Sequence, residues 1–282
     1  INTGTGPRNT LITSVINNYI NSLSVNGGTA VITDSQSTRG LEATGALFIG
    51  SNGGGSGNAL TGTISEILVF NRALQNDERQ QVEGYLAWKW GLVQNLPTTH
   101  PYYYAKAPQT AFQPTNFPSC ALWLDAADRN TISSRVSQWN DKSGLENHAT
   151  QATAANRPTY SNNGLYFGTS GTPFMSITNL NLLRNVPYAG MFIVSRINTA
   201  QTQNANRGTA FGASIGTSAS ARFAVTLSDA GNNLNPGTLG RRLDAESSVS
   251  ALDSTTATTL NTTNIFFGEA NYSARTIANV LN

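Results

Sequence analysis

Apolar and polar positions alternate along most of this chain in short runs, as in β-strands that bury one face. The strongest run spans 63–70, where Ile64, Ile67 and Val69 have a high preference for strands. Similar runs lie at 8–27 (two short strands), 29–33, 46–50, 121–126, 136–141, 165–168, 175–179, 190–197, 209–215, 221–228, 263–271 and 274–281. Strands at this spacing predict an all-β antiparallel sandwich rather than an α/β fold.

One segment follows a helical period instead. The apolar residues after Asn76 recur at positions that share one face of a helix: Val82, Tyr85, Leu86 and Trp90. Asn76 suits the N-cap, and Gly91 suits the position just after the last turn, where a left-handed backbone is common. The pattern therefore predicts one short α-helix over 76–90.

Two segments lack both periods. The stretch 93–118 carries five of the ten prolines and predicts a linker between two parts of the chain. Its tyrosines, 102–104, suit either packing of the linker onto a sandwich or an aromatic surface for a ligand. The Gly-rich segment 51–59 lacks the Lys-Ser/Thr pair of a phosphate-binding loop and predicts a hairpin connection.

The composition narrows the class of protein. Only 11% of residues are charged, and the formal net charge is +2. Because there is no run of Lys or Arg, nucleic-acid binding is not expected. No apolar run reaches the ~18 residues of a membrane-spanning helix, so membrane insertion is not expected either. Cys120 is the only cysteine, and its apolar neighbours predict a buried thiol.

Two motifs carry a resemblance to a known family. Residues 62–74, GTISEILVFNRAL, resemble the closing motif of LamG-like domains in the concanavalin A-like lectin/glucanase superfamily. Residues 121–128, ALWLDAAD, and 138–151, QWNDKSGLENHATQ, resemble the opening strands of the same domains. The resemblance implies a jelly-roll sandwich. Similar domains followed by a segment such as 86–102 occur in surface proteins of large DNA viruses and of bacteria.

The two motifs stand in reverse order, since the closing motif precedes the opening one. We therefore interpret 1–92 as the C-terminal part of one sandwich, 93–118 as a linker and 119–282 as the N-terminal part of a second sandwich. A weak internal repeat between 10–27 and 263–282 agrees with this order. Three arrangements stay open: a circularly permuted sandwich, copies that complete one another head to tail, and a fragment of a longer tandem-repeat chain.

The resemblance also implies a metal. LamG-like domains often bind Ca²⁺ near one rim of the sandwich, and calcium takes oxygen ligands from carboxylates and amides. By resemblance the candidates here are Asp141 and Asn147, with Asp125 or Asp128 as a further ligand. The favoured interpretation of Asp141 is a turn at 143–144 held by its own side chain. Calcium is the only cofactor for which the sequence offers candidates.

Catalysis is not expected. The related glucanases place two or three carboxylates on one strand, and such a pair acts as nucleophile and acid. In this sequence the acids stand singly: Glu66, Glu78, Asp125, Asp128, Asp141 and Glu269. The two histidines, His100 and His148, lie in the linker and beside a turn. A degenerate glycoside hydrolase is the third-ranked hypothesis.

The leading hypothesis is a non-enzymatic structural and adhesive module of a tandem-repeat or filament-forming protein. Neutral β proteins rich in hydroxyl and amide groups are typical of extracellular, virion or cell surfaces. The expected partners are copies of the chain or adjacent repeats, head to tail, together with glycans. The alternative is a Ca²⁺-dependent carbohydrate-binding lectin domain.

Overall fold

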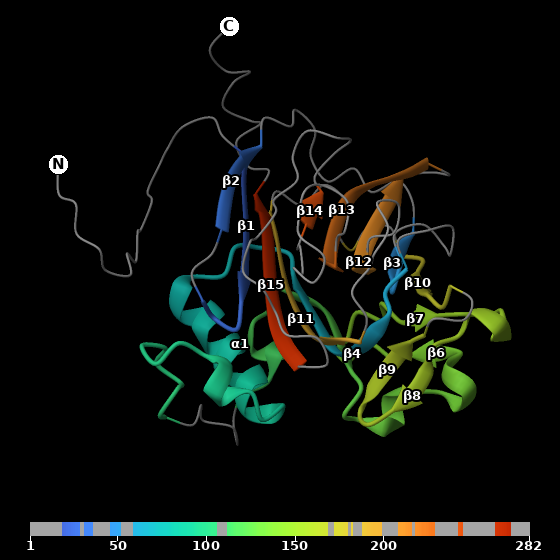
Figure 1. The fold of residues 1–282 in the computed structure, drawn as a ribbon, viewed down its shortest axis with the longest axis horizontal. Helices are drawn as coiled ribbons and strands as arrows, with labels where there is room; N and C mark the ends of the chain where they lie inside the picture. The colour runs from blue at the N-terminus through green and yellow to red at the C-terminus, as the bar shows by residue number, and fades with distance from the viewer. Residues whose placement is uncertain are drawn as a thin grey trace, which may run out of the picture.

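The computed structural model describes residues 19–28, 31–35, 46–51, 59–105, 112–168, 172–179, 182, 188–198, 208–215, 218–228, 242–244 and 263–271. These residues form two antiparallel β-sheets and one α-helix, α1 (Asn76–Lys89), as the sequence predicted (Figure 1). Short 3-10 helices lie at Val93–Asn95, Pro114–Asn116, Arg129–Thr131, Ser134–Val136 and Ala154–Asn156. The strands predicted within 8–18 and 274–281 and the loop 52–58 lie outside the described residues.

The first sheet, sheet A, has the strand order β2-β1-β15-β11-β4-β9-β8, and β5 also pairs with β4. Its strands are β1 (Tyr19–Val25), β2 (Val31–Ser35), β4 (Gly62–Phe70), β5 (Cys120–Asp125), β8 (Thr159–Ser161), β9 (Gly164–Phe167), β11 (Tyr188–Ile197) and β15 (Thr263–Asn271). Strand β4 is central, because β11 pairs along one side of it while β9 and β5 share the other side.

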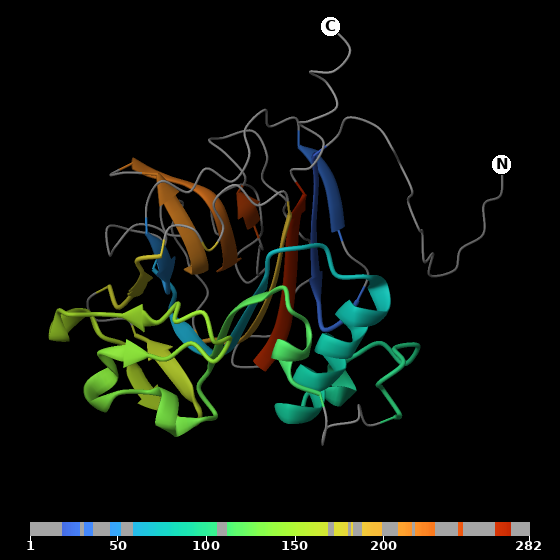
Figure 2. The same ribbon diagram turned by 180° about the vertical axis from the view of Figure 1, so that it is seen from behind.

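The second sheet, sheet B, has the order β14-β13-β12-β3-β10-β7-β6. Its strands are β3 (Leu47–Ile49), β6 (Gln138–Trp139), β7 (Ala149–Thr150), β10 (Met175–Ile177), β12 (Gly208–Ile215), β13 (Ser218–Ser228) and β14 (Arg242–Asp244). In Figure 1, helix α1 and strands β12 and β13 lie on opposite sides of the central strands β15 and β11, and Figure 2 shows this from behind. The described elements thus form three layers.

Most predicted strands are present with small changes of bounds, and 263–271 is β15 without change. The strand predicted at 136–141 is wrong in extent, because only Gln138–Trp139 pairs as β6. Arg135 and Val136 have positive φ angles of 56° and 50°, which end the extended backbone before that point. The sequence did not predict the short strands β7, β8 and β14.

The two predicted parts, 1–92 and 119–282, contribute strands to both sheets. In sheet A, β4 of the first part pairs with β11 of the second part on one side and with β9 and β5 of the second part on the other. In sheet B, β3 of the first part lies between β12 and β10 of the second. Within this chain, then, the two parts pack on each other. Their assignment to two successive sandwiches of a longer protein stays a prediction.

Two hydrophobic clusters hold the layers together. The sandwich core fills the space between the sheets, and its largest fully buried side chains are Trp139, Phe167 and Phe211. The helix-side cluster lies between sheet A and α1 and includes Phe70 and Phe192. Their rings meet edge to face at 5.9 Å, which adds to the area that they bury.

A β-bulge in β4 decides which side chains face the helix. Opposite β4, Val194 pairs with Glu66 and the next residue, Ser195, pairs with Ile64, so Ser65 is the extra residue. Without the bulge, the alternation of a strand would place Ile64 and Glu66 on the same face. With it, Ile64 joins the sandwich core, whereas Glu66 faces α1.

Helix α1 starts at Asn76, as predicted, and ends at Lys89, one residue before the predicted end, with a different N-cap. Gly91 follows the last turn with a φ of 67°, as predicted. The N-cap is Gln75 rather than Asn76, because the Glu78 carboxylate accepts a hydrogen bond from the Gln75 backbone at 2.9 Å. Glu78 also binds both terminal nitrogens of Arg72 at 2.7 Å. The Arg72 of the closing motif therefore fixes the start of the helix.

Candidate functional site

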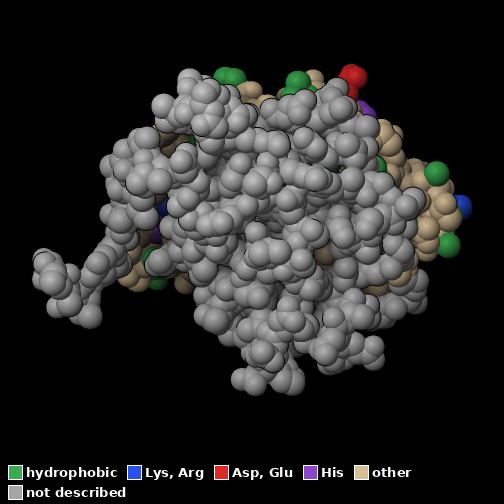
Figure 3. Space-filling model, turned by 90° about the horizontal axis from the view of Figure 1, so that it is seen from above, with side chains coloured by type: hydrophobic (Ala, Val, Ile, Leu, Met, Phe, Trp, Pro, Cys, Tyr) green, Lys and Arg blue, Asp and Glu red, His purple; other side chains and the backbone are tan. Residues whose placement is uncertain are grey.

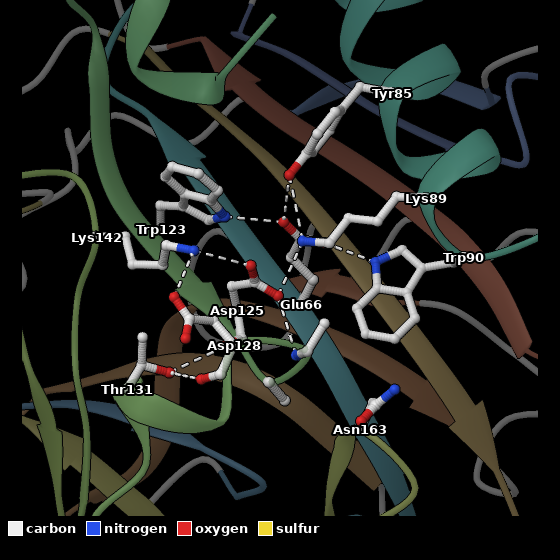
Figure 4. A network of polar contacts seen from close by, with 12 residues as sticks. Glu66, Tyr85, Lys89, Trp90, Trp123, Asp125, Asp128, Thr131, Lys142 and Asn163 are labelled. Atoms are coloured by element: carbon white, nitrogen blue, oxygen red, sulfur yellow. Dashed lines mark hydrogen bonds and ion pairs between the residues drawn. The ribbon is translucent and has the colours of Figure 1, made fainter. Parts of the chain in front are cut away.

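A buried carboxylate, Glu66, occupies the space between sheet A and α1 (Figure 4). Its Oε2 atom accepts from Trp90 Nε1 at 2.6 Å and pairs with Lys89 Nζ at 2.9 Å. Its Oε1 atom accepts from Trp123 Nε1 at 2.8 Å and, at 3.4 Å, from the Tyr85 hydroxyl. The Glu66 side chain is 0% exposed, so these four donors replace its water.

Two lysines extend the network to a second carboxylate, Asp125. Lys89 Nζ lies 2.8 Å from Asp125 Oδ1, and Lys142 Nζ lies 3.1 Å from Asp125 Oδ2. Lys142 also pairs with Asp128 at 3.0 Å, nearer to solvent. Negative and positive groups thus alternate from the buried Glu66 to the half-buried Asp128, which lowers the cost of burying each charge.

Three elements place these side chains. Glu66 and Asp125 are directly opposite each other in the β4–β5 pair. Tyr85 and Lys89 lie one turn apart on α1 and therefore point to the same side of the helix. Trp123 stands two residues before Asp125 on β5, so both side chains face α1.

Aromatic rings line the cationic groups. Lys89 Nζ lies 5.4 Å from the ring centres of Tyr85 and Trp90, and Lys142 Nζ lies 4.4 Å from that of Trp123. An ammonium over an aromatic face is attracted by the ring's negative face. The rings therefore hold the lysine head groups in place while they keep water away from Glu66.

Burial and charge shift the pKa values of the network. Burial raises the pKa of Glu66, and the neighbouring Asp125 raises it further, against the opposing effect of Lys89. The hydrogen bond from Lys142 lowers the pKa of Asp128. For Lys142 itself, burial acts to lower the pKa, but Asp128 and Asp125 outweigh burial and raise it. Of Glu66 and Asp128, Glu66 is therefore the carboxyl whose protonated form the fold favours.

The raised pKa of Glu66 predicts a pH dependence of stability. Stabilisation by a group with a raised pKa is fully present below its ordinary value of 4.5 and is lost as the pH rises through the folded value. The free energy of unfolding of the native chain minus that of Glu66→Gln should therefore fall as the pH rises above 4.5. Urea unfolding at a series of pH values measures this difference, and a difference that grows with pH would contradict it.

The predicted calcium residues, Asp141 and Asn147, lie together, and protein groups bind their oxygens. Asp141 Oδ1 accepts from the backbone of Trp123 and of Ser143, both at 2.9 Å. Its Oδ2 accepts from the Ser143 hydroxyl at 2.6 Å and from the Asn147 backbone at 3.0 Å. Asn147 Oδ1 accepts from Asn179 Nδ2 at 2.6 Å. The Asp141 side chain thus holds the turn at 143–144, as the favoured interpretation predicted. The calcium site stays a prediction.

This set of hydrogen bonds predicts the effect of a neutral substitution. Asp141→Asn exchanges one acceptor oxygen for an NH₂ group that faces backbone donors. We expect the free energy of unfolding to fall by about 1–3 kcal/mol, the usual cost of leaving a buried polar group unsatisfied. Urea unfolding with excess calcium and with a chelator measures the change. A loss that appears only with calcium would instead assign Asp141 to a metal.

A second buried pair, Glu83 and His100, fixes the turn after β1. His100 Nε2 lies 3.1 Å from Glu83 Oε2, and Glu83 also pairs with Arg79. The backbone N–H of Tyr102 donates to His100 Nδ1 at 3.3 Å, so Nε2 carries the proton. A Cβ atom on Gly27 would lie 3.0 Å from the His100 ring. The linker histidine therefore packs directly beneath the β1–β2 turn.

The three linker tyrosines have different surroundings. A Cβ atom on Gly84 would lie 2.5 Å from the Tyr102 ring, and the Tyr102 carbonyl accepts from Trp88 Nε1 at 3.0 Å. Tyr103 packs against the helix-side cluster. The Tyr104 side chain is 81% exposed and meets the Tyr103 ring edge to face at 4.7 Å. Packing thus accounts for the first two rings, and Tyr104 faces solvent.

Cys120 is buried, as predicted, with 4% of its surface exposed. Burial, assisted by the nearby Asp141, raises the pKa of the thiol to about 12. Because the thiolate is the reactive form, we expect the folded chain to resist a thiol reagent at pH 8. The chain unfolded in urea should bind one equivalent. Equal labelling rates in the two states would contradict the burial of Cys120.

The sequence predicted isolated acids, and this prediction is wrong for three of them. Glu66, Asp125 and Asp128 share one network, because β4 pairs with β5 although the two strands are far apart in sequence. The signal in the sequence was a lone Glu within the apolar run 62–70, but the resemblance of segment 62–74 to a known motif explained this Glu without assigning it a partner. Lys89 and Lys142 carried no signal of their own.

No family model matches the chain, and neither a curated protein nor a solved structure is significantly similar to it. Within the described part of the chain, no helix is long and apolar enough to cross a membrane. The same residues contain no cluster of three or more side chains suited to a metal ion. In the view from above (Figure 3), the described side chains are seen mainly at the margins of the molecule.

Proposed function

We propose that the chain is a non-enzymatic structural and adhesive module of a tandem-repeat or filament-forming protein on the outside of a virion or a cell. It belongs, in this proposal, to the LamG-like class of jelly-roll sandwiches that segment 62–74 resembles. Its partners are copies of itself or adjacent repeats, arranged head to tail.

The polar network supports a structural role for the buried acids. Both carboxylates of the β4–β5 pair contact Lys89 within 3 Å, and Glu66 has two indole donors as well. A general acid or a nucleophile that acts on a bound substrate must instead reach an atom of that substrate. Through these contacts the two acids connect α1 to sheet A and stabilise the packing of the two layers.

The head-to-tail proposal starts from the pairing of β1 with β15, two strands far apart in the sequence, which neighbouring copies could exchange. The pair runs in register from Asn21 opposite Ala270 to Val25 opposite Phe266. The turn adds two hydrogen bonds of 2.8 Å between Asn26 and Ile265. If β1 of one copy bound β15 of the next, the contact would be heterologous, and its repetition would build a filament.

Cysteine pairs on β1 and β15 test this arrangement. Ser22 lies opposite Glu269, and Cα atoms of opposite residues in an antiparallel pair are about 4.5–5.5 Å apart, within the range of a disulfide. We expect a mixture of Ser22→Cys chains and Glu269→Cys chains to form covalent dimers under oxidation. The double variant should form a ladder of oligomers on a non-reducing gel.

The control places the second cysteine out of register. Asn264 pairs with Ser195 rather than with β1, so Ser22→Cys mixed with Asn264→Cys should give only the background of each variant alone. A double variant that closes an internal disulfide, together with no dimers from the mixture, would overturn the head-to-tail proposal and leave a self-contained permuted sandwich.

A second function, glycan binding by a Ca²⁺-dependent lectin site, is favoured by the exposed Tyr104 ring. An aromatic face that is open to solvent can stack on the apolar face of a sugar. A glycan array with and without calcium tests this function. Tyr104→Ala should abolish any signal, whereas Leu145→Ala, at a side chain that is also exposed, should not. An array without any signal would exclude the lectin hypothesis for the glycans tested.

A further inference from the structure

Lys89 stands between two buried carboxyl groups in an arrangement that favours reaction as well as ion pairing. Its Nζ atom lies 2.8 Å from Asp125 Oδ1 and 2.9 Å from Glu66 Oε2 (Figure 4). The side chains of Glu66 and Asp125 are 0% and 6% exposed, and that of Lys89 is 19% exposed. The rings of Trp90 and Trp123 lie against the ammonium. Such an amine and acid are held together with little water between them.

We propose that Lys89 Nζ and the Asp125 carboxyl condense into an intramolecular amide bond that fastens α1 to β5. The bond would be a covalent modification of the chain by its own side chains. It needs neither the filament nor a ligand, and so it is independent of the proposed function.

The step balances without an oxidant or a co-reactant. Proton transfer within the ion pair gives a neutral amine and a carboxylic acid, which are the reactive forms. The amine nitrogen attacks Asp125 Cγ, an N–C bond forms, and a C–O bond breaks. The leaving oxygen departs as water with two protons that began on the ammonium, and the third proton stays on the amide nitrogen.

Glu66 and Lys142 have separate roles in this step. The burial that raises the pKa of Glu66 favours its protonated form. It can then give its proton to the leaving oxygen and take one from the attacking nitrogen, so it ends as it began. Lys142 lies 3.1 Å from Asp125 Oδ2 and stabilises the negative charge that develops there.

The same contacts select Asp125 over Glu66 as the acceptor. The Glu66 carboxyl accepts from two indole N–H groups, Trp90 at 2.6 Å and Trp123 at 2.8 Å, which hold it in place for proton transfer. Asp125 instead has a lysine on each oxygen, one as the nucleophile and one to stabilise the developing charge. The products are therefore an amide at Asp125 and an unchanged Glu66.

Intact mass spectrometry of the purified, denatured full-length chain tests the proposal. We expect a mass below that of the sequence by one water molecule. Trypsin should no longer cleave after Lys89, and the peptides 80–106 and 107–129 should appear as one branched species. A chain that keeps the full mass of its sequence after prolonged incubation in the folded state would overturn the proposal. A branch from Lys89 to the peptide 40–72, which contains Glu66, would overturn the choice of acceptor.

Two variants separate chemistry from folding. Glu66→Gln keeps the shape and one acceptor oxygen but cannot carry the proton, so its mass should equal that of its sequence while its circular dichroism stays native. Asp128→Asn removes a carboxylate that contacts Lys142 and not Lys89, so it should still lose one water. Loss of water in Glu66→Gln at the native rate would overturn the role of Glu66.

Discussion

Glu66→Ala is expected to lower the free energy of unfolding by about 3–5 kcal/mol, the usual effect of removing one partner of a buried ion pair. In the native chain the carboxylate binds Trp90, Trp123 and Lys89, and it is 0% exposed. Alanine leaves two indole N–H groups without an acceptor and opens a cavity beneath α1. Urea unfolding followed by circular dichroism measures the loss.

The matched control removes an acid that has no buried role. Glu146 is exposed in the turn that follows 143–144, so Glu146→Ala should change the free energy of unfolding by less than about 0.5 kcal/mol. If the two variants lost the same small amount, the network would contribute little to the fold, and the structural role assigned to Glu66 would be wrong.

Phe70→Ala is the second large expected effect, again a loss of about 3–5 kcal/mol in the free energy of unfolding. The Phe70 ring is 0% exposed and lies at the end of β4. It packs edge to face against Phe192 at 5.9 Å and Phe117 at 6.2 Å. Its removal leaves a cavity between sheet A and the segment that follows α1. A urea unfolding curve gives the size of the loss.

An exposed aromatic residue supplies the comparison for Phe70. Tyr104 is 81% exposed, so Tyr104→Ala should leave the midpoint of unfolding nearly unchanged. An unchanged midpoint for Phe70→Ala as well would mean that β4 does not bury this ring, and both the strand and its place in sheet A would have to be abandoned.

The strands and the helix could be predicted because their formation depends mainly on residues close together in the sequence. The alternation in 263–271 predicted β15 with its observed bounds, and the apolar spacing after Asn76 predicted α1. Gly91 marked the end of the helix because a left-handed backbone there favours glycine. The strand predicted at 136–141 was too long, since apolar spacing carries no information on the positive φ angles at 135 and 136.

The candidate site depends on contacts between segments that are far apart in the sequence, and these contacts cannot be predicted from local patterns. A one-residue bulge at Ser65 turns Glu66 toward α1, and neither the bulge nor the β4–β5 register can be read from alternation alone. The predicted calcium residues illustrate the same limit. Their types suit both a metal and a side-chain turn, and the backbone donors that bind the oxygens of Asp141 are visible only in the fold, while the calcium site stays a prediction.

The sequence by itself determined the all-β class, the α-helix that begins at Asn76, the buried thiol and the strands that carry the core, because periodicity, capping and burial are local properties of the chain. The tertiary structure decided that 1–92 and 119–282 share both sheets, and that Glu66, Asp125, Lys89 and Lys142 meet in one network. The physical reason is that strand partners and bulges follow from packing between distant segments, and this packing brings isolated charges within 3.1 Å of one another.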